Sequence, residues 1–441
     1  MIGYQQEQRS LTREQKEAVG LLSIGTFLEY FDLMLYVHLA VLLNELFFEP
    51  TDPFTASLGT AFAFCSTYLL RPIGALLFGY LGDNYGRNIT VILTTTMMSA
   101  SCVVMAMLPT YAEIGITASI LVTICRMVQG LSSMGEVIGA DIYVTEITKP
   151  PVQYPAVSMI TIFSSLGGLA ALGVAYFVIY ENFNWRYAFW AGAGIALVGS
   201  IARTKLRETP DFANAKSRVK NIIKKAGFNH DSIESNPIVQ EKVKTKSSIS
   251  LFLINCAWPV CFYFIYFHCG NILKSSFGYT GEQIITHNFY IAIAQALSVI
   301  VTAYLSYYIY PLILIKIRMI IFSIIILTFP YILYNLTSPL QLLIFQLVIG
   351  TFSLGFFSGQ PILYKHFPVF KRFTYAGFMY ALSRILMYII TSFGFIYLTN
   401  YFGNYAVLVI MIPVTLGFAF GLNHFGNLEK EVGNYPQKDL N

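Results

Sequence analysis

Long apolar runs, separated by short polar segments, fill most of the chain. In the first part of the chain these runs lie at 18–48, 56–81, 89–108, 114–144, 155–180 and 187–201. In the second part they lie at 251–271, 284–308, 310–334, 340–364, 374–398 and 405–422. A helix needs about 20 mostly apolar residues to cross a bilayer, whereas membrane strands alternate in polarity. The pattern therefore predicts an all-α integral membrane protein with twelve transmembrane helices in two six-helix halves.

The polar segments divide the chain into five parts. We expect a leader at 1–17, an N-terminal half at 18–202, a central loop at 203–250, a C-terminal half at 251–422 and a tail at 423–441. Within the central loop, residues 215–228 place apolar side chains among lysines. This pattern is typical of a short helix that lies on an anionic membrane surface or, alternatively, of a solvated linker helix.

The composition narrows the class further. Of the 441 residues, 56% are hydrophobic and 12% are charged, and soluble domains carry about twice that charged fraction. A soluble enzyme and a single-span receptor with a large external domain are excluded. The six cysteines lie in apolar runs without metal-ligand spacing. Because no glycine-rich phosphate loop, HExxH or GxSxG motif occurs, we expect no enzymatic activity, no cofactor and no metal.

The basic residues predict the orientation of the chain in the membrane. If the amino terminus is cytoplasmic, 23 of the 28 Lys and Arg residues, Arg318 among them, fall on the cytoplasmic side. Only Arg186 and Lys274 fall on the opposite side. The positive-inside rule then places both termini and the central loop in the cytoplasm. The net charge of +5 is too small and too scattered to indicate a nucleic-acid partner.

A glycine-rich turn with two charges follows the second predicted span. It contains Gly79, Gly82, Asp83, Gly86 and Arg87. The turn resembles the GxLxDxxGR signature of the major facilitator superfamily. Glycines let helix ends approach closely, and the two charges can bridge to neighbouring helix ends. The resemblance implies a transporter in which these residues form a conformational gate that holds one state shut.

Further stretches resemble one branch of that superfamily, the metabolite:proton symporters, which include proline/betaine, 2-oxoglutarate and citrate carriers. The quoted stretches are GTFLEYFDLMLY at 25–36, RPIG at 71–74, RMVQG at 126–130, LRETPDF at 206–212 and HFPVFKRF at 366–373. The resemblance implies proton-coupled uptake of a small solute across the bacterial inner membrane by a monomer. The second half lacks the branch's LSDxxGRR turn and reads LSYYIY at 305–310. We therefore expect no symmetric cytoplasmic gate, and coupling that rests on the first half.

Two carboxylates lie near the middle of the first predicted span. Glu29 and Asp32 are three residues apart and therefore share one face of a helix. Charges at mid-bilayer cost at least about 2.5–3.5 kcal/mol, so each needs a partner, water or a proton. Two carboxylates so close disfavour simultaneous ionisation, and one could hold a proton for coupling. The alternative is that both form structural ion pairs with Arg71 or Arg126.

The fourth predicted span carries a polar stripe that faces the bundle interior. Arg126 can anchor a substrate carboxylate, with Gln129 beside it, because its guanidinium stays charged. Glu136 follows on the same helix and is a third candidate for proton coupling. Glu146 ends the span and is expected to pair with Arg87 in the gate.

Three more residues are candidate substrate contacts. Arg71 belongs to the RPIG stretch and is either a substrate contact or a structural partner of a first-span acid. Arg384 is the only basic residue deep in the second half and is a candidate second anchor. Tyr30 could contribute to a cation-π site for an ammonium group. A proline- or betaine-like zwitterion is the first expectation, and a dicarboxylate or a non-transporting sensor on the same fold remain alternatives.

Overall fold

The computed structural model describes residues 7–48, 67–180, 183–203 and 241–435, and its regular elements are helices. The predicted helix at 215–228 and the start of the second span lie outside the described residues. The N-terminal half contains α1 (Arg13–Phe47), α3 (Arg71–Asn84), α4 (Arg87–Met107), α5 (Tyr111–Ile114), α6 (Ile116–Ile147), α7 (Gln153–Tyr180) and α8 (Trp185–Arg203). The C-terminal half contains α12 (Thr245–Phe262), η1 (Tyr263–His268), α13 (Cys269–Phe277), α14 (Gly281–Tyr308), α15 (Pro311–Tyr334), α16 (Pro339–Thr351), η2 (Phe357–Gly359), α17 (Gln360–Lys365), α18 (Arg372–Phe402), η3 (Gly403–Tyr405) and α19 (Ala406–Glu431).

Each predicted span corresponds to helical structure. Nine helices of the described part are long and apolar enough to cross a membrane. The other three predicted spans correspond to α3, to α8 and to the broken pair α16 and α17. The helices also run past the apolar runs, since α1 begins at Arg13 and α19 ends at Glu431. Backbone hydrogen bonding does not require apolar side chains, so a helix can continue into the polar region beyond the bilayer.

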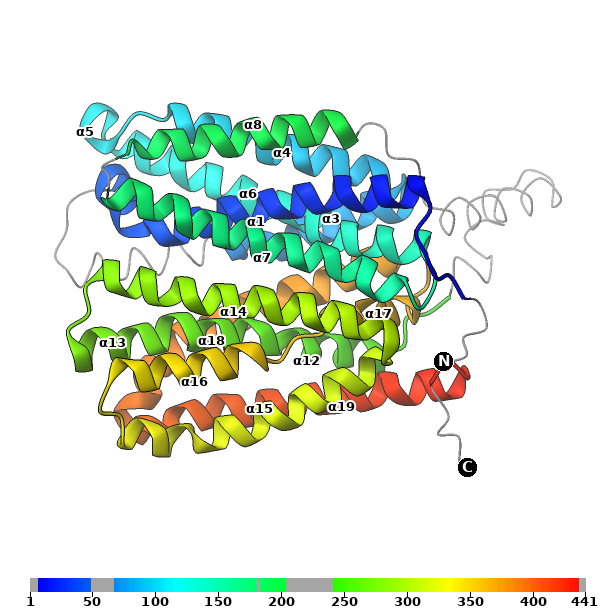
Figure 1. The fold of residues 1–441 in the computed structure, drawn as a ribbon. Helices are drawn as coiled ribbons and strands as arrows, with labels where there is room; N and C mark the ends of the chain where they lie inside the picture. The colour runs from blue at the N-terminus through cyan, green and yellow to red at the C-terminus, as the bar shows by residue number, and fades with distance from the viewer. Residues whose placement is uncertain (1–6, 49–66, 181–182, 204–240, 436–441) are drawn as a thin grey trace.

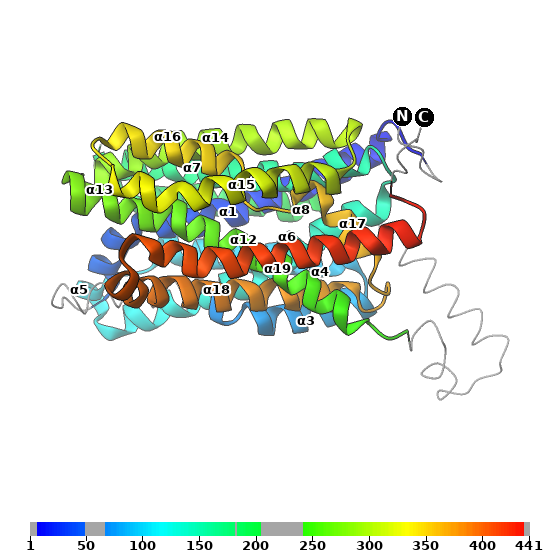
Figure 2. The same ribbon diagram turned by 90° about the horizontal axis from the view of Figure 1, so that it is seen from below.

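The two halves form two layers that lie against each other (Figure 1). Within the interface α3 packs against α18, and α7 packs against α14. Figure 2 shows the helices running nearly parallel along the length of the bundle. The start of α1 and the end of α19 lie at one end of the bundle (Figure 1), which also contains the end of α3 and the start of α18. We call this end the gate end.

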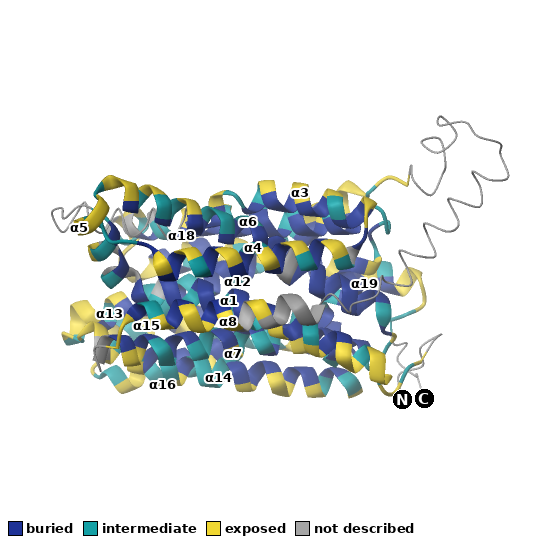
Figure 3. Ribbon diagram, turned by 90° about the horizontal axis from the view of Figure 1, so that it is seen from above, coloured by how far each residue is buried: buried dark blue, intermediate teal, exposed yellow. Residues whose placement is uncertain are grey.

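Apolar side chains cover the outside of the bundle as well as its interior. Figure 3 shows buried residues on the inner faces of the helices and exposed ones on the outer faces. Exposed large apolar residues include Leu77, Ile120, Leu327 and Leu416. Such a surface would aggregate in water, whereas lipid tails solvate it. The burial pattern therefore agrees with a multi-pass membrane protein.

The tenth predicted span is broken in the structure. Helix α16 ends at Thr351, and α17 starts only at Gln360. Arg318 of α15 stabilises this break, because its guanidinium donates to the Thr351 carbonyl oxygen at 2.7 Å and to the Thr302 hydroxyl at 2.6 Å. A cation is favourable at the carbonyl end of a helix. From the positive-inside rule we expected Arg318 on the cytoplasmic side. In the structure its side chain is instead partly buried between helices.

Candidate functional site

A cavity of about 130 Å³ lies between the two halves. Helices α1, α3, α6 and α7 line it from the N-terminal half, and α12, α14, α15, α16 and α18 line it from the C-terminal half. Its charged side chains and tyrosines are Tyr30, Tyr68, Arg71, Asp141, Tyr266, Arg318, Tyr380, Arg384 and Tyr388. A space between two halves that is lined by both is suited to a ligand that each half contacts.

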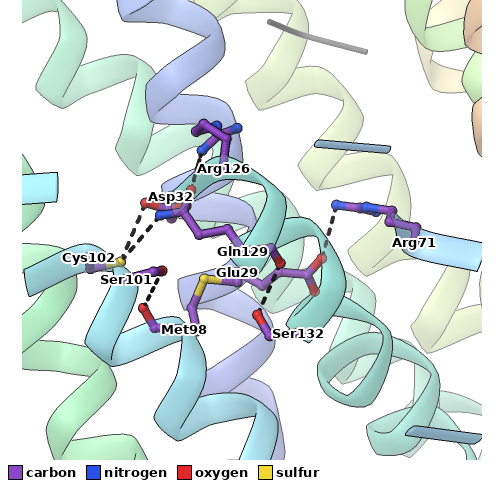
Figure 4. Close-up of polar contacts among 9 residues, drawn as sticks. All are labelled: Glu29, Asp32, Arg71, Met98, Ser101, Cys102, Arg126, Gln129 and Ser132. Carbon is purple, nitrogen blue, oxygen red and sulfur yellow. Dashed lines mark hydrogen bonds and ion pairs between the residues drawn. The ribbon is translucent and has the colours of Figure 1, made fainter. Parts of the chain in front are cut away.

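Glu29 of α1 and Arg71 of α3 form one buried ion pair. Their atoms Oε1 and Nη2 lie 3.5 Å apart, and both side chains are almost fully buried (Figure 4). The Arg71 guanidinium also lies over the Tyr68 ring, 4.5 Å from its centroid. Arg71 lines the cavity and Glu29 does not. The arginine therefore connects the first-span carboxylate with the cavity.

Asp32 forms a second cluster with α6, one turn further along α1. Arg126 Nη1 lies 3.4 Å from Asp32 Oδ2 and donates to Gln129 Oε1 at 2.7 Å. The Cys102 thiol of α4 donates to Asp32 Oδ1 at 3.4 Å (Figure 4). The Arg126 guanidinium lies over the Tyr36 ring. None of these side chains lines the cavity, so the cluster holds α1, α4 and α6 together behind the cavity wall.

Arg384 of α18 differs from both paired arginines. It is 8% exposed and lines the cavity, and no acidic side chain in the described ranges forms an ion pair with it. Its Nε atom has no hydrogen-bond partner. The cavity therefore contains a buried guanidinium whose charge no carboxylate of the described part balances. A ligand carboxylate would supply the missing charge.

Four tyrosines from both halves surround the Arg384 charge. Its electrostatic neighbours are Tyr30, Tyr68, Tyr380 and Tyr388, and the guanidinium lies 4.6 Å from the centroid of the Tyr380 ring. The Tyr30 and Tyr380 hydroxyls are 3.4 Å apart, and the Tyr68 and Tyr388 rings are 4.5 Å apart. Sequence reasoning missed Tyr380 and Tyr388, although their four-residue spacing from Arg384 places all three on one helix face.

The predicted gate residues meet the start of α18. The Asp83 carboxylate accepts hydrogen bonds from the backbone N–H of Phe373 at 3.1 Å and from the N–H and hydroxyl of Thr374 at 2.9 and 2.8 Å. An anion at a helix amino terminus satisfies free N–H groups and the helix dipole. A Cβ at Gly79 would lie 2.6 Å from Thr374 Cα, and one at Gly82 would lie 2.8 Å from the Phe373 ring. The glycines thus permit this contact between halves.

Glu146 of α6 adds an ion pair to the gate. Its Oε1 atom lies 2.8 Å from Nη1 of Arg372 on α18, and both side chains are buried. Gly86, which precedes α4, has a backbone φ angle of 136°. Residues with a side chain rarely adopt a positive φ, so this position favours glycine. The side chains of Arg87 and Glu136 lie outside the described residues, so the expected pairing of Glu146 with Arg87 remains a prediction. Arg372, within the quoted HFPVFKRF stretch, was not anticipated as a gate residue.

A different contact occupies the part of the second half where the LSDxxGRR turn is missing. The Tyr310 hydroxyl, at the junction of α14 and α15, donates to Glu429 Oε2 of α19 at 2.6 Å. The His366 ring nitrogen Nε2 lies 2.8 Å from the other oxygen of Glu429. This contact lies within the C-terminal half. The two halves therefore differ at the gate end.

Comparison with known proteins identifies the family. The sequence profile of the Major Facilitator Superfamily matches residues 22–390. The chain belongs to the major facilitator superfamily. The resemblance read from the glycine-rich turn is thereby confirmed, as is the all-helical membrane fold. Members of this superfamily are membrane transporters.

Individual relatives add more detail. The proline/betaine transporter of Salmonella typhimurium is 30% identical over 279 residues, which are 61% of this chain and 55% of that protein. A putative metabolite transport protein of Haemophilus influenzae is 33% identical over 213 residues, which are 46% and 48% of the two chains. The matches thus span about half the length of these relatives. The solved proton:xylose symporter XylE has a TM-score of 0.74 at 14% identity, covering 95% of this chain and 96% of its own, so it supports the fold.

Proposed function

We propose that this superfamily member is a secondary active transporter that couples proton entry to the uptake of a small organic solute. It would act as a monomer in the bacterial inner membrane, with both termini in the cytoplasm. The observation that carries the proposal is the buried guanidinium of Arg384 in a cavity lined by both halves. Alternating access would open this cavity first on one side and then on the other.

The solute is a proline- or betaine-like zwitterion in this proposal. Its carboxylate would bind Arg384, with Arg71 as a second cation of the cavity. Its ammonium group would lie against a tyrosine ring such as that of Tyr30, because the face of the ring attracts cations. The name of the relative from Salmonella typhimurium supports this solute class. A dicarboxylate is the second candidate, because Arg318 provides a further guanidinium in the same cavity.

Proton coupling would begin at the first-span carboxylates. A solute carboxylate that binds Arg71 competes with Glu29, which lies 3.5 Å from that guanidinium. A buried carboxylate that loses its cation favours the protonated form, so solute binding would promote proton binding. Asp32 pairs with Arg126 behind the cavity wall, and Gln129 also holds that guanidinium, so Asp32 would bind a proton only when a helix movement weakens the pair. Glu136 remains a further candidate on α6.

Labelled proline, glycine betaine and 2-oxoglutarate, offered to proteoliposomes with and without an inward proton gradient, test this proposal. We expect the gradient to raise the accumulation of proline or glycine betaine above that of 2-oxoglutarate. Accumulation of 2-oxoglutarate alone would replace the zwitterion with the dicarboxylate. No gradient-stimulated uptake of any of the three would refute proton symport of these solutes, and a non-transporting sensor would then be the better interpretation.

A further inference from the structure

A carboxyl on α6 also faces the central cavity. Asp141 is 1% exposed and lines the cavity. Its Oδ1 atom has no hydrogen-bond partner. Among the described side chains, no Lys, Arg or His forms an ion pair with it. In this respect Asp141 differs from Glu29 and Asp32, each of which has an arginine beside it.

The contact that Asp141 does make crosses between the halves. Its carboxyl lies next to the hydroxyl of Tyr364 on α17, which is also buried. The next residue, Lys365, donates to Gln153 Oε1 of α7 at 2.6 Å. Five residues beyond Asp141 on α6, Glu146 pairs with Arg372 of α18. Asp141 therefore lies between the cavity and the contacts that connect the two halves at the gate end.

The groups around Asp141 leave its charge unbalanced. Tyr364 on α17 and the Glu29 carboxylate on α1 act on it directly. Arg71 on α3 is held by Glu29, and Arg372 on α18 is held by Glu146. Helices α4 and α7 also pack on α6, and no basic side chain of theirs in the described part forms an ion pair with Asp141. Among the described side chains, no cation is thus available to balance an ionised Asp141.

We propose that Asp141 is a proton-binding site that couples protonation to closure of the gate end, a role that rests on the proposed transport function. In the closed state the carboxyl is buried without a cation, so the neutral acid is the favoured form. The proton arrives from the external medium and forms an O–H bond with a carboxylate oxygen. When the gate end opens, water hydrates the carboxylate, the O–H bond breaks, and the proton leaves to the cytoplasm. Because Tyr364 belongs to the opposite half, its distance from this carboxyl changes when the two halves move apart.

The variant Asp141→Asn removes the ionisable group and nearly preserves the side-chain shape. Purified protein in proteoliposomes would be assayed with labelled proline in two ways. Counterflow, which exchanges solute without net proton movement, should stay within about twofold of wild type. Accumulation driven by an inward proton gradient, and acidification of the lumen on proline addition, should be lost. Accumulation at the wild-type level in this variant would overturn the proposal, and so would loss of counterflow together with accumulation.

A pair of tyrosine variants keeps the test decisive if Asp141→Asn does not fold. Tyr364→Phe removes the hydroxyl that contacts Asp141 across the two halves, and it should lower accumulation while it preserves counterflow. Tyr310→Phe is the matched control, because it removes a hydroxyl from another buried tyrosine–carboxyl pair that lies within one half. We expect Tyr310→Phe to accumulate proline like wild type. Equal accumulation by the two variants would overturn the coupling role of Asp141.

A measurement without solute tests proton binding by Asp141 independently of the proposed transport function. Infrared difference spectra of the reconstituted protein, recorded while the pH is raised, should contain a carboxylic acid C=O band that disappears on deprotonation. The band should be missing from Asp141→Asn and present in Tyr310→Phe. If wild type transports none of the solutes, the proposed function fails, yet this band still tests proton binding. An unchanged band in Asp141→Asn would show that Asp141 binds no proton.

Discussion

At the scale of single residues, the buried arginines fall into two kinds. Arg71 and Arg126 each lie beside a carboxylate of α1, whereas Arg384 lies among tyrosines and forms no ion pair with an acid of the described part. Loss of a paired arginine leaves a buried carboxylate with an uncompensated charge. Loss of Arg384 leaves no such charge. The two kinds should therefore differ in what they contribute to stability and to binding.

The variant Arg126→Gln should unfold more easily than Arg384→Gln. Breaking a buried ion pair by removing one partner costs about 3–5 kcal/mol, and here it would isolate Asp32 from its 3.4 Å contact with Arg126. Thermal unfolding of the purified protein in detergent measures this difference. The double variant Asp32→Asn with Arg126→Gln should recover part of the lost stability. Equal melting temperatures for the two single variants would contradict the structural role of Arg126.

The variant Arg384→Gln should weaken solute binding rather than stability. A hydrogen bond to a charged group contributes about 1.5–3 kcal/mol, so the KM for proline should rise by roughly 10- to 150-fold. Uptake kinetics in proteoliposomes provide the measurement. Lys274→Gln, which removes an exposed cation of α13, is the control and should leave the KM unchanged. An unaltered KM in Arg384→Gln would remove this residue from the binding site.

The sequence predicted the residue types of the site better than their pairing. Intramembrane charges stand out in an apolar chain, so Glu29, Asp32, Arg126 and Arg384 could all be found without a structure. Glu29 forms its ion pair with Arg71, and Asp32 forms its ion pair with Arg126. These pairings depend on how α1, α3 and α6 pack, so the sequence alone left them open. No role for Asp141 could be predicted from the sequence, because its neighbour on α17 comes from a segment more than 200 residues away.

At the scale of elements, α3 and α18 contact each other at the gate end, and we expect this contact to form and break as the gate end closes and opens. Asp83 binds the first N–H groups of α18, and Gly79 lets the two backbones approach. Hydrogen bonds to Asp83 hold the two helices together, and the missing side chain at Gly79 allows them to approach closely. A side chain at Gly79 would therefore interfere with closure while it leaves each half intact.

The variant Gly79→Ala should shift the protein away from the closed gate. Its added Cβ would lie 2.6 Å from Thr374 Cα, and overpacking of this kind costs about 1–3 kcal/mol. Spin labels at Asn84→Cys and Tyr375→Cys, both exposed at the gate end, should then report longer distances by pulsed electron resonance. Gly173→Ala, where the Cβ would meet nothing within 4 Å, is the control. Identical distance distributions in the two variants would argue against a steric gate.

The helices themselves could be predicted, but their interruptions could not. Apolar runs of sufficient length specify where a helix crosses the membrane, and the described helices overlap all twelve runs. The segment 352–356 between α16 and η2, and the π-helical turn Tyr263–His268, interrupt runs whose apolar character continues unchanged. Hydropathy responds to the solvent around a side chain and not to the backbone hydrogen-bond pattern. The sequence contained one indication of the break after α16. Arg318 is a charged residue near an apolar run, and its guanidinium binds the carbonyl oxygen of Thr351 where that helix ends.

At the scale of the whole molecule, the orientation in the membrane decides which side the closed gate faces. From the positive-inside rule we expect the gate end to face the cytoplasm. Single cysteines at Lys274 and Lys430 test this, since both side chains are exposed and belong to opposite ends of their helical half. In intact cells an impermeant thiol reagent should modify Lys274→Cys and spare Lys430→Cys. The reverse labelling would invert the topology and with it the direction of transport.

We propose that solute and proton move together through one cavity between the two halves. Reciprocal coupling requires that a solute gradient alone can move protons. Proteoliposomes with equal pH on both sides and a pH-sensitive dye inside would receive external proline or glycine betaine. We expect the lumen to become acidic. A protonophore should abolish this acidification, and Arg384→Gln should weaken it at low solute concentration. Uptake of labelled solute without any change of internal pH would contradict the proposal.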